Sequence, residues 1–176
     1  ETTATLTIAH AGEGTAVITV TATNPNSPLG AAQFTYTNDV TSPTAALSYA
    51  VSGTAATSVK GGEVVTITAT FDEPVADSPS MRLSGSGVVD VQNEDMTRVN
   101  PTSYTHTWTV IPGAGGVQTW TLSSGTDLAG NVVVASPSSG GSILQDPTPV
   151  TPQGTGTESD PYLIATAGNL NWLSQT

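Results

Sequence analysis

Residues 61–74, GGEVVTITATFDEP, join a glycine turn, a strand pattern and an acidic loop in one continuous stretch. The alternation places Val65, Ile67, Ala69 and Phe71 on one face and Val64 with three threonines on the other. Side chains that alternate with a period of two lie on opposite faces of a β-strand. The stretch therefore predicts a half-buried strand that ends at the acidic pair Asp72 and Glu73.

The composition points the same way and excludes several classes of function. The chain has 176 residues, 3 Lys+Arg against 14 Asp+Glu and a formal net charge of −11. A chain this acidic is repelled by phosphate backbones and anionic lipid, so we expect neither nucleic-acid binding nor membrane insertion of this segment. There is no cysteine, which removes disulfides and thiolate metal sites. Threonine and valine are abundant, and both pack well on pleated surfaces.

Residues 40–145 carry the pattern of a complete domain. The candidate strands are 44–51, 63–71, 80–84, 88–92, 103–111, 117–122 and 131–135. Seven short strands separated by Gly, Pro, Ser and Asn are typical of an antiparallel β-sandwich. We expect its core to contain Ile67, Phe71, Leu83, Trp108, Trp120 and Leu122. The predicted fold class is therefore all-β.

The flanks differ from this central domain. Residues 1–39 show three strand patterns, at 5–9, 15–23 and 31–37, which are too few to close a sandwich. We interpret them as the last strands of a preceding, incomplete domain. Residues 146–176 begin with a Pro/Thr linker, predicted to be an extended tail. A short helix is then predicted, with Thr166 as its N-cap and Leu170, Trp172 and Leu173 on its apolar side.

Three segments resemble the bacterial Ig-like repeats of large secreted surface proteins. Residues 61–71 resemble the second strand of that family, residues 127–131 its last hairpin, and residues 41–44 its inter-domain linker. The resemblance implies an Ig-like sandwich over 40–145 and an incomplete Ig-like domain over 1–39. Residues 154–173 resemble the opening of the β-solenoid regions that follow such repeats. The family's location implies a protein that is secreted or held at the bacterial cell surface.

Acidic residues are predicted to gather at one pole of the sandwich. Successive strands run between two poles, so the loops after the second, fourth and sixth strands share the pole at which the chain enters. These loops and the entering linker carry Asp39, Asp72, Glu73, Asp77, Glu94, Asp95 and Asp127. Ca²⁺ takes about six to eight oxygen ligands from carboxylates and carbonyls. We predict a Ca²⁺ site formed by Asp39, Asp72, Glu73 and Asp127, against the alternative that these loops are only solvated.

No catalytic constellation is evident, so we expect no enzyme. The sequence holds no Ser in a G-x-S-x-G elbow, and its two histidines, His10 and His106, lie far apart in sequence. Asp72 and Glu73 are adjacent and point to opposite sides, unlike the facing carboxylates of a glycosidase.

Two functions remain open. The first is a structural or adhesive repeat module, a spacer or assembly unit of a surface protein or filament, whose partners are neighbouring Ig-like domains or subunits of the same protein. The alternative is a carbohydrate-binding accessory module of a polysaccharide-active exoprotein. It is suggested by Trp108, Trp120 and Trp172, which could stack on sugar rings of a surface glycan. A protein ligand at the surface is also open.

Overall fold

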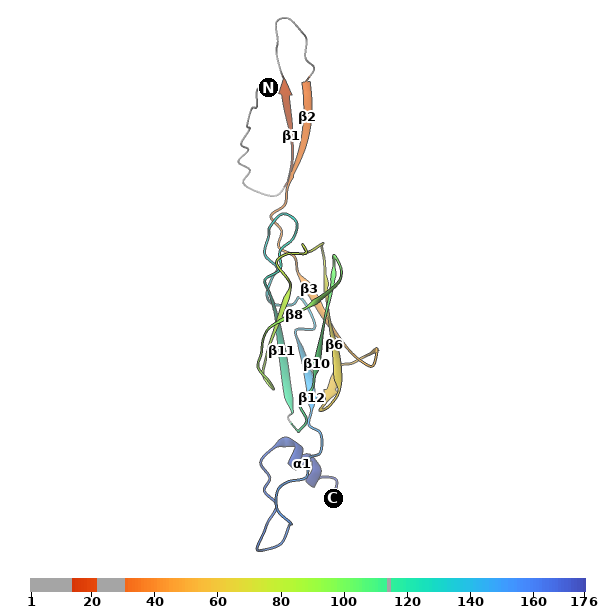
Figure 1. Ribbon diagram of the computed structural model, residues 1–176, viewed down its shortest axis with the longest axis vertical. Helices are drawn as coiled ribbons and strands as arrows, with labels where there is room; N and C mark the ends of the chain where they lie inside the picture. The colour runs from red at the N-terminus through yellow and green to blue at the C-terminus, as the bar shows by residue number, and fades with distance from the viewer. Residues whose placement is uncertain (1–13, 22–30, 114) are drawn as a thin grey trace, which may run out of the picture.

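The computed structural model describes residues 14–21, 31–113 and 115–176. Its parts follow one another along one long axis (Figure 1). The hairpin of β1 (Gly14–Thr21) and β2 (Ala31–Asn38) lies at one end, a two-sheet sandwich in the middle, and α1 (Ala167–Leu173) at the other end. The strand predicted at 5–9 lies outside the described residues. No helix in the described ranges is long and apolar enough to cross a bilayer.

The first sheet of the sandwich is antiparallel. Its strand order is β4 (Thr54–Ala55), β3 (Ala45–Val51), β6 (Val64–Phe71), β10 (Ser103–Thr109) and β9 (Thr97–Asn100). The strand predicted from residues 61–74 is β6, at the centre of this sheet. Ile67 of β6 lies between Tyr49 of β3 and His106 of β10 in the register. The alternation of apolar residues in β6 therefore matches its burial, with Val65, Ile67, Ala69 and Phe71 inside.

The second sheet is mixed. Its order is β5 (Ser58–Lys60), β12 (Ser142–Asp146), β11 (Gly116–Ser123), β7 (Arg82–Ser86) and β8 (Val91–Asp95). All its pairings are antiparallel except that of β5 with β12, which is parallel. The chain passes from β8 to β9 through Met96, so one continuous stretch forms an edge of both sheets.

The core lies between the two sheets and confirms the six predicted core residues. Ile67, Phe71, Leu83, Trp108, Trp120 and Leu122 are all buried. Trp108 of the first sheet meets Trp120 of the second edge to face, with ring centroids 5.2 Å apart. Phe71 and Tyr104 form a similar pair at 5.8 Å. Edge-to-face contact is favourable because the positive edge of one ring meets the negative face of the other.

The prediction of a strand at 131–135 is wrong. Val132 forms only an isolated bridge with Thr126, and the last strand of the sandwich is β12. The backbone of this segment bonds instead to other parts of the chain, as in the bond from Val134 N to Pro43 O at 2.9 Å. The short strands β4, β5 and β9 were also not predicted. The remaining six predicted strands of 40–145 correspond to β3, β6, β7, β8, β10 and β11, with shifted ends for β7 and β8.

The predicted C-terminal helix is confirmed as α1. The Thr166 side chain accepts a hydrogen bond from Asn169 N at 3.1 Å, and the Asn169 side chain accepts one from Thr166 N, which completes a capping box. Leu170 and Leu173 of this helix are exposed at 61% and 48%, so the described chain leaves these two leucines uncovered, whereas Trp172 packs against Tyr162.

Candidate functional site

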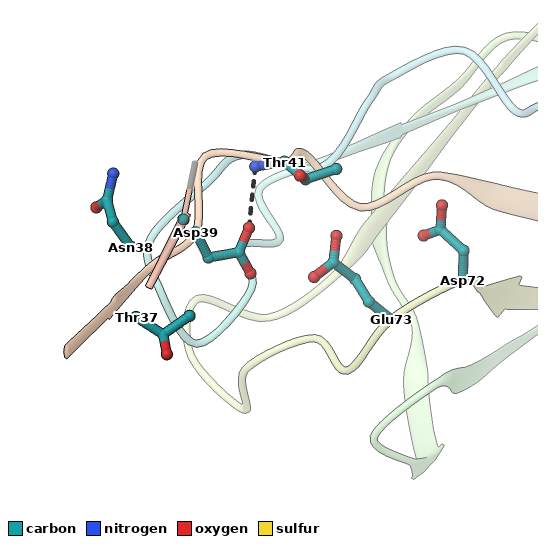
Figure 2. A pocket seen from close by; sticks show the side chains of 7 residues that line it. Thr37, Asn38, Asp39, Thr41, Asp72 and Glu73 are labelled. Carbon is teal, nitrogen blue, oxygen red and sulfur yellow. Dashed lines mark hydrogen bonds between the residues drawn. The ribbon is translucent and has the colours of Figure 1, made fainter. Parts of the chain in front are cut away.

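The pole at which the chain enters the sandwich brings three carboxylates together. Asp39 lies in the segment between β2 and β3, Glu73 follows β6, and Asp127 lies in the loop after β11. One carboxylate oxygen from each lies within 4.8 Å of the others. Figure 2 shows the side chains of Asp39 and Glu73 turned toward one another from separate segments. We call Asp39, Glu73 and Asp127 the junction carboxylates.

The Asp127 carboxylate is held in place by hydrogen bonds within its own loop. Its side chain is buried, and Oδ1 accepts hydrogen bonds from Gly130 N at 2.6 Å and Asn131 N at 2.8 Å. Oδ2 accepts a third bond from Asn131 Nδ2 at 2.7 Å. Burial alone would raise the pKa of Asp127, but the bonds donated by Asn131 and Gly130 outweigh burial and hold that pKa below its ordinary value. Asp127 is therefore ionised near neutral pH.

The same loop also holds the entering segment. Asn131 Nδ2 donates to the backbone oxygen of Asp39 at 3.0 Å. The Asp39 side chain turns back to accept a bond from Thr41 N at 3.0 Å (Figure 2). The carboxylate of the linker and that of the loop thus belong to one connected network, although 88 positions separate Asp39 from Asp127.

Asp72 has another role than the one predicted for it. Its Oδ1 accepts a bond from Thr44 N at 2.8 Å and its Oδ2 accepts one from Thr44 Oγ1 at 2.7 Å. The hydrogen bond from the Thr44 side chain lowers the pKa of Asp72, against a smaller opposing effect of burial. Asp72 fastens the entering chain to the end of β6, and it is not part of the group formed by the junction carboxylates.

The other acidic residues predicted at this pole are partly neutralised. Arg82 Nε lies 2.9 Å from Asp95 Oδ1, and Arg98 Nε lies 2.8 Å from Asp77 Oδ1. The chain has only three basic side chains, and the third, Lys60, ends β5 beside Asp146 at the opposite pole.

Two open hollows flank the junction carboxylates. One, of about 490 Å³, is lined by Gly14, Thr37, Asn38, Asp39, Thr41, Asp72 and Glu73. The other, of about 380 Å³, is lined by Thr37, Asp39, Glu73, Pro74, Asp127, Leu128 and Ala129. Both combine residues of the entering chain with residues of the sandwich. A small cation could reach the carboxylates from either side.

The three tryptophans are not equivalent as sugar-stacking candidates. Trp108 and Trp120 are buried between the sheets and present no face to a ligand. Trp172 is half-buried on α1 and lies edge to face with Tyr162, with ring centroids 5.0 Å apart. Tyr162 is 39% exposed, so among the three tryptophans it is Trp172, with Tyr162 beside it, that keeps an aromatic surface suited to a sugar.

Comparison with known proteins adds no identification, because no family model, curated protein or solved structure matches the chain.

Proposed function

We propose that this chain is a structural module of the bacterial Ig-like kind, a spacer or assembly unit of a secreted or surface-held protein or filament. The observation that supports this most directly is that the first and the last segments of the sandwich are hydrogen-bonded to each other. The chain enters at one pole through β3 and leaves at the opposite pole through β12 (Figure 1). Tension applied to the flanking segments therefore acts along the length of the sandwich.

The segment that enters β3 is bonded directly to the segment that leads into β12. Three backbone hydrogen bonds join them, from Val134 N to Pro43 O, from Ser138 N to Ala45 O and from Leu47 N to Ser139 O, at 2.9, 2.8 and 2.9 Å. The two segments run in parallel, as the bridge between Ala46 and Ser139 shows. We call these three bonds the terminal clamp.

The direction of pulling decides how the terminal clamp resists. When the first segment is drawn toward one pole and the last segment toward the other, the two slide past each other and the three bonds are loaded together. Bonds that are peeled apart from one end are instead loaded one at a time. A parallel pairing of the first and last segments is therefore suited to a module that carries tension between its neighbours.

The test is single-molecule stretching of the 176-residue chain from its two ends. We expect the sandwich to unfold in one step, releasing on the order of 300 Å of chain for its roughly one hundred residues. Replacing Ser138 by Pro removes its backbone N–H, which breaks the middle bond of the terminal clamp, and should lower the unfolding force. The Ser138→Ala variant is the control for loss of the side-chain bond alone. Unfolding in many small steps would contradict the proposal.

We also propose that the junction carboxylates bind Ca²⁺ at the boundary with a preceding Ig-like domain. Three carboxylates from three segments lie close together, and backbone oxygens of the entering chain could complete the ligand set. A bound ion would link the linker to two loops of the sandwich and stiffen the junction. Asp72 is omitted from this set because both of its oxygens bind Thr44.

The calcium proposal is tested by thermal melts in EDTA, in CaCl₂ and in NaCl of matched ionic strength. An ion that binds only the folded chain stabilises it by about 2.7 kcal/mol at a hundredfold excess over its Kd. Simple screening of negative charge would make NaCl as effective as CaCl₂. Equal midpoints in the two salts would therefore eliminate the site.

A second candidate is a carbohydrate-binding accessory module, favoured by the half-exposed pair of Tyr162 and Trp172. A glycan array with the whole chain tests it. Binding that is lost in Trp172→Ala would support this function, and an array without signal would remove it.

A further inference from the structure

We propose that residues 147–176 form a rigid coupling that fixes the direction in which the chain leaves the sandwich, and not the extended tail that their Pro/Thr composition predicts. The observations concern only the C-terminal pole and α1, so the inference does not depend on the function proposed above. They are of two kinds, a set of hydrogen bonds and a set of close approaches at glycine.

The hydrogen bonds tie the C-terminal segment to the sandwich and to itself. Gly113, in the loop between β10 and β11, accepts a bond from Gly168 N at 3.1 Å and donates one to Thr148 Oγ1 at 3.0 Å. Val150 N in turn donates to Gly168 O at 2.9 Å. The loop between β10 and β11, the 147–150 segment and the first turn of α1 are therefore joined in one closed ring of hydrogen bonds.

Two asparagines of α1 strengthen this ring. Asn169 is buried, and its Nδ2 donates to Val150 O at 2.9 Å while its Oδ1 accepts bonds from Ala165 N and Thr166 N. Asn171 Nδ2 donates to the backbone oxygen of Pro147. The proline-rich segment is thus held by side chains of the helix on one side and by Gly113 on the other. A free linker would have neither.

The close approaches show that this contact tolerates no added atom. A Cβ at Gly168 would lie 2.7 Å from Thr148 O and 2.9 Å from Gly113 Cα. A Cβ at Gly115 would lie 2.9 Å from Pro147 Cδ, and one at Gly61 would lie 2.9 Å from Thr148 Oγ1. A groove of about 550 Å³ lies beside the contact and is lined by residues of both sides, among them Gly113 and Asn169. The glycines therefore decide whether α1 can dock.

The coupling also fixes the direction of an exposed apolar surface. The exposed side chains of Leu170 and Leu173 belong to α1, and a docked helix holds them in a fixed direction relative to the sandwich strands.

The test is the measurement of residual dipolar couplings for backbone amides of the whole 176-residue chain. If the unit is docked, one alignment tensor fits both the sandwich strands and residues 147–173 of the wild type. Gly168→Ala should require a second tensor for α1, although alanine favours helix more than glycine does. The control is Gly141→Ala, where a Cβ would meet nothing closer than Pro137 at 3.6 Å, and it should keep one tensor.

Helical chemical shifts of residues 167–173 separate undocking from unfolding of α1. If Gly168→Ala loses the helix, Thr148→Val replaces it as the test variant, because it removes the acceptor of the Gly113 N–H without altering the helix. Two tensors in the wild type, or one unchanged tensor in the variant that keeps its helix, would overturn the proposal.

Discussion

Replacing Trp120 by alanine tests the assignment of the core between the two sheets. Trp120 is 0% exposed, and its ring lies 5.2 Å from that of Trp108 in the opposite sheet. Its Nε1 has no hydrogen-bond partner in the described part of the chain, so the substitution removes packing and no hydrogen bond. Removal of a buried Trp costs about 3–5 kcal/mol, which includes about 0.5–1.5 kcal/mol for the edge-to-face pair.

This loss is a large fraction of the roughly 5–15 kcal/mol by which a domain is stable. For a sandwich of roughly one hundred residues, about 1 kcal/mol shifts Tm by about 4–8 °C, so we expect Tm to fall by at least about 12 °C. The assay is urea denaturation followed by far-ultraviolet circular dichroism, with a thermal melt beside it.

The matched control is Trp172→Ala. This residue is also a tryptophan in an edge-to-face pair, but it lies on α1 outside the sandwich. We expect it to leave the sandwich transition within about 0.5 kcal/mol of the wild type. Coincident midpoints for Trp120→Ala and the wild type, or an equal loss in both variants, would refute the assignment of Trp120 to the core.

Three further predictions follow from the junction and from the strand count. Asp39→Asn should weaken the Ca²⁺-dependent rise of Tm while leaving Tm in EDTA nearly unchanged. A variant whose Tm falls in EDTA but still rises with Ca²⁺ as in the wild type would show that Asp39 has a purely structural role. The pKa of Asp127 is lower in the folded chain than its ordinary value of 3.8. The ionised carboxylate therefore contributes fully to the free energy of unfolding above the unfolded-state pKa, and this contribution is lost as the pH falls through the folded-state pKa. Urea melts between pH 6 and about pH 2 should therefore show a shallower acid loss in Asp127→Asn than in the wild type, and parallel curves would contradict this reasoning. A fragment of residues 40–146 should melt cooperatively and a fragment of residues 1–39 should not, because a two-stranded sheet is marginal in water; a cooperative melt of the short fragment would contradict the division.

The sequence was sufficient to predict the centre of the fold because the central strand obeys a simple rule. In β6, each second side chain is buried, so alternation in the sequence maps directly onto the two faces of the sheet. Trp108 of β10 and both Trp120 and Leu122 of β11 are buried for the same reason. Such strands are recognised from local pattern alone.

The end of the sandwich could not be predicted in this way, because polar residues are buried there. Gln145 of β12 and Gln118 of β11 are both 0% exposed. Gln145 Nε2 donates to Ile111 O at 2.7 Å, and Gln118 bonds both backbone groups of Val89. Hydrogen-bond partners that are distant in sequence thus allow these two polar side chains to be buried. The local sequence pattern does not show which partners they will have.

The three valines at 132–134 suggest a strand that the chain does not form, for the opposite reason. They have the composition of a strand, but only Val133 of the three is buried. Their backbone bonds to Gly125 and Pro43, because this segment carries the chain from β11 back along β3 before β12 joins the second sheet.

The junction carboxylates could be placed at one pole from strand direction alone. Successive strands run in alternate directions, so the segments that carry Asp39, Glu73 and Asp127 share one pole. The structure brings these three side chains together there. The role of Asp72 could not be foreseen. Adjacent residues point to opposite sides, and only the position of Thr44 decides that Asp72 fastens the entering chain.

The central claim is that the sandwich resists tension through the terminal clamp, and the direction of pulling tests this most directly. The chain has no cysteine, so pairs of introduced cysteines give unique attachment points. Val40→Cys with Pro149→Cys pulls the two poles apart and loads the terminal clamp in shear, whereas Val40→Cys with Pro74→Cys peels β3 from β6 at one pole. We predict a clearly higher unfolding force for the first pair than for the second. Equal forces, or a lower force for the first pair, would contradict the account.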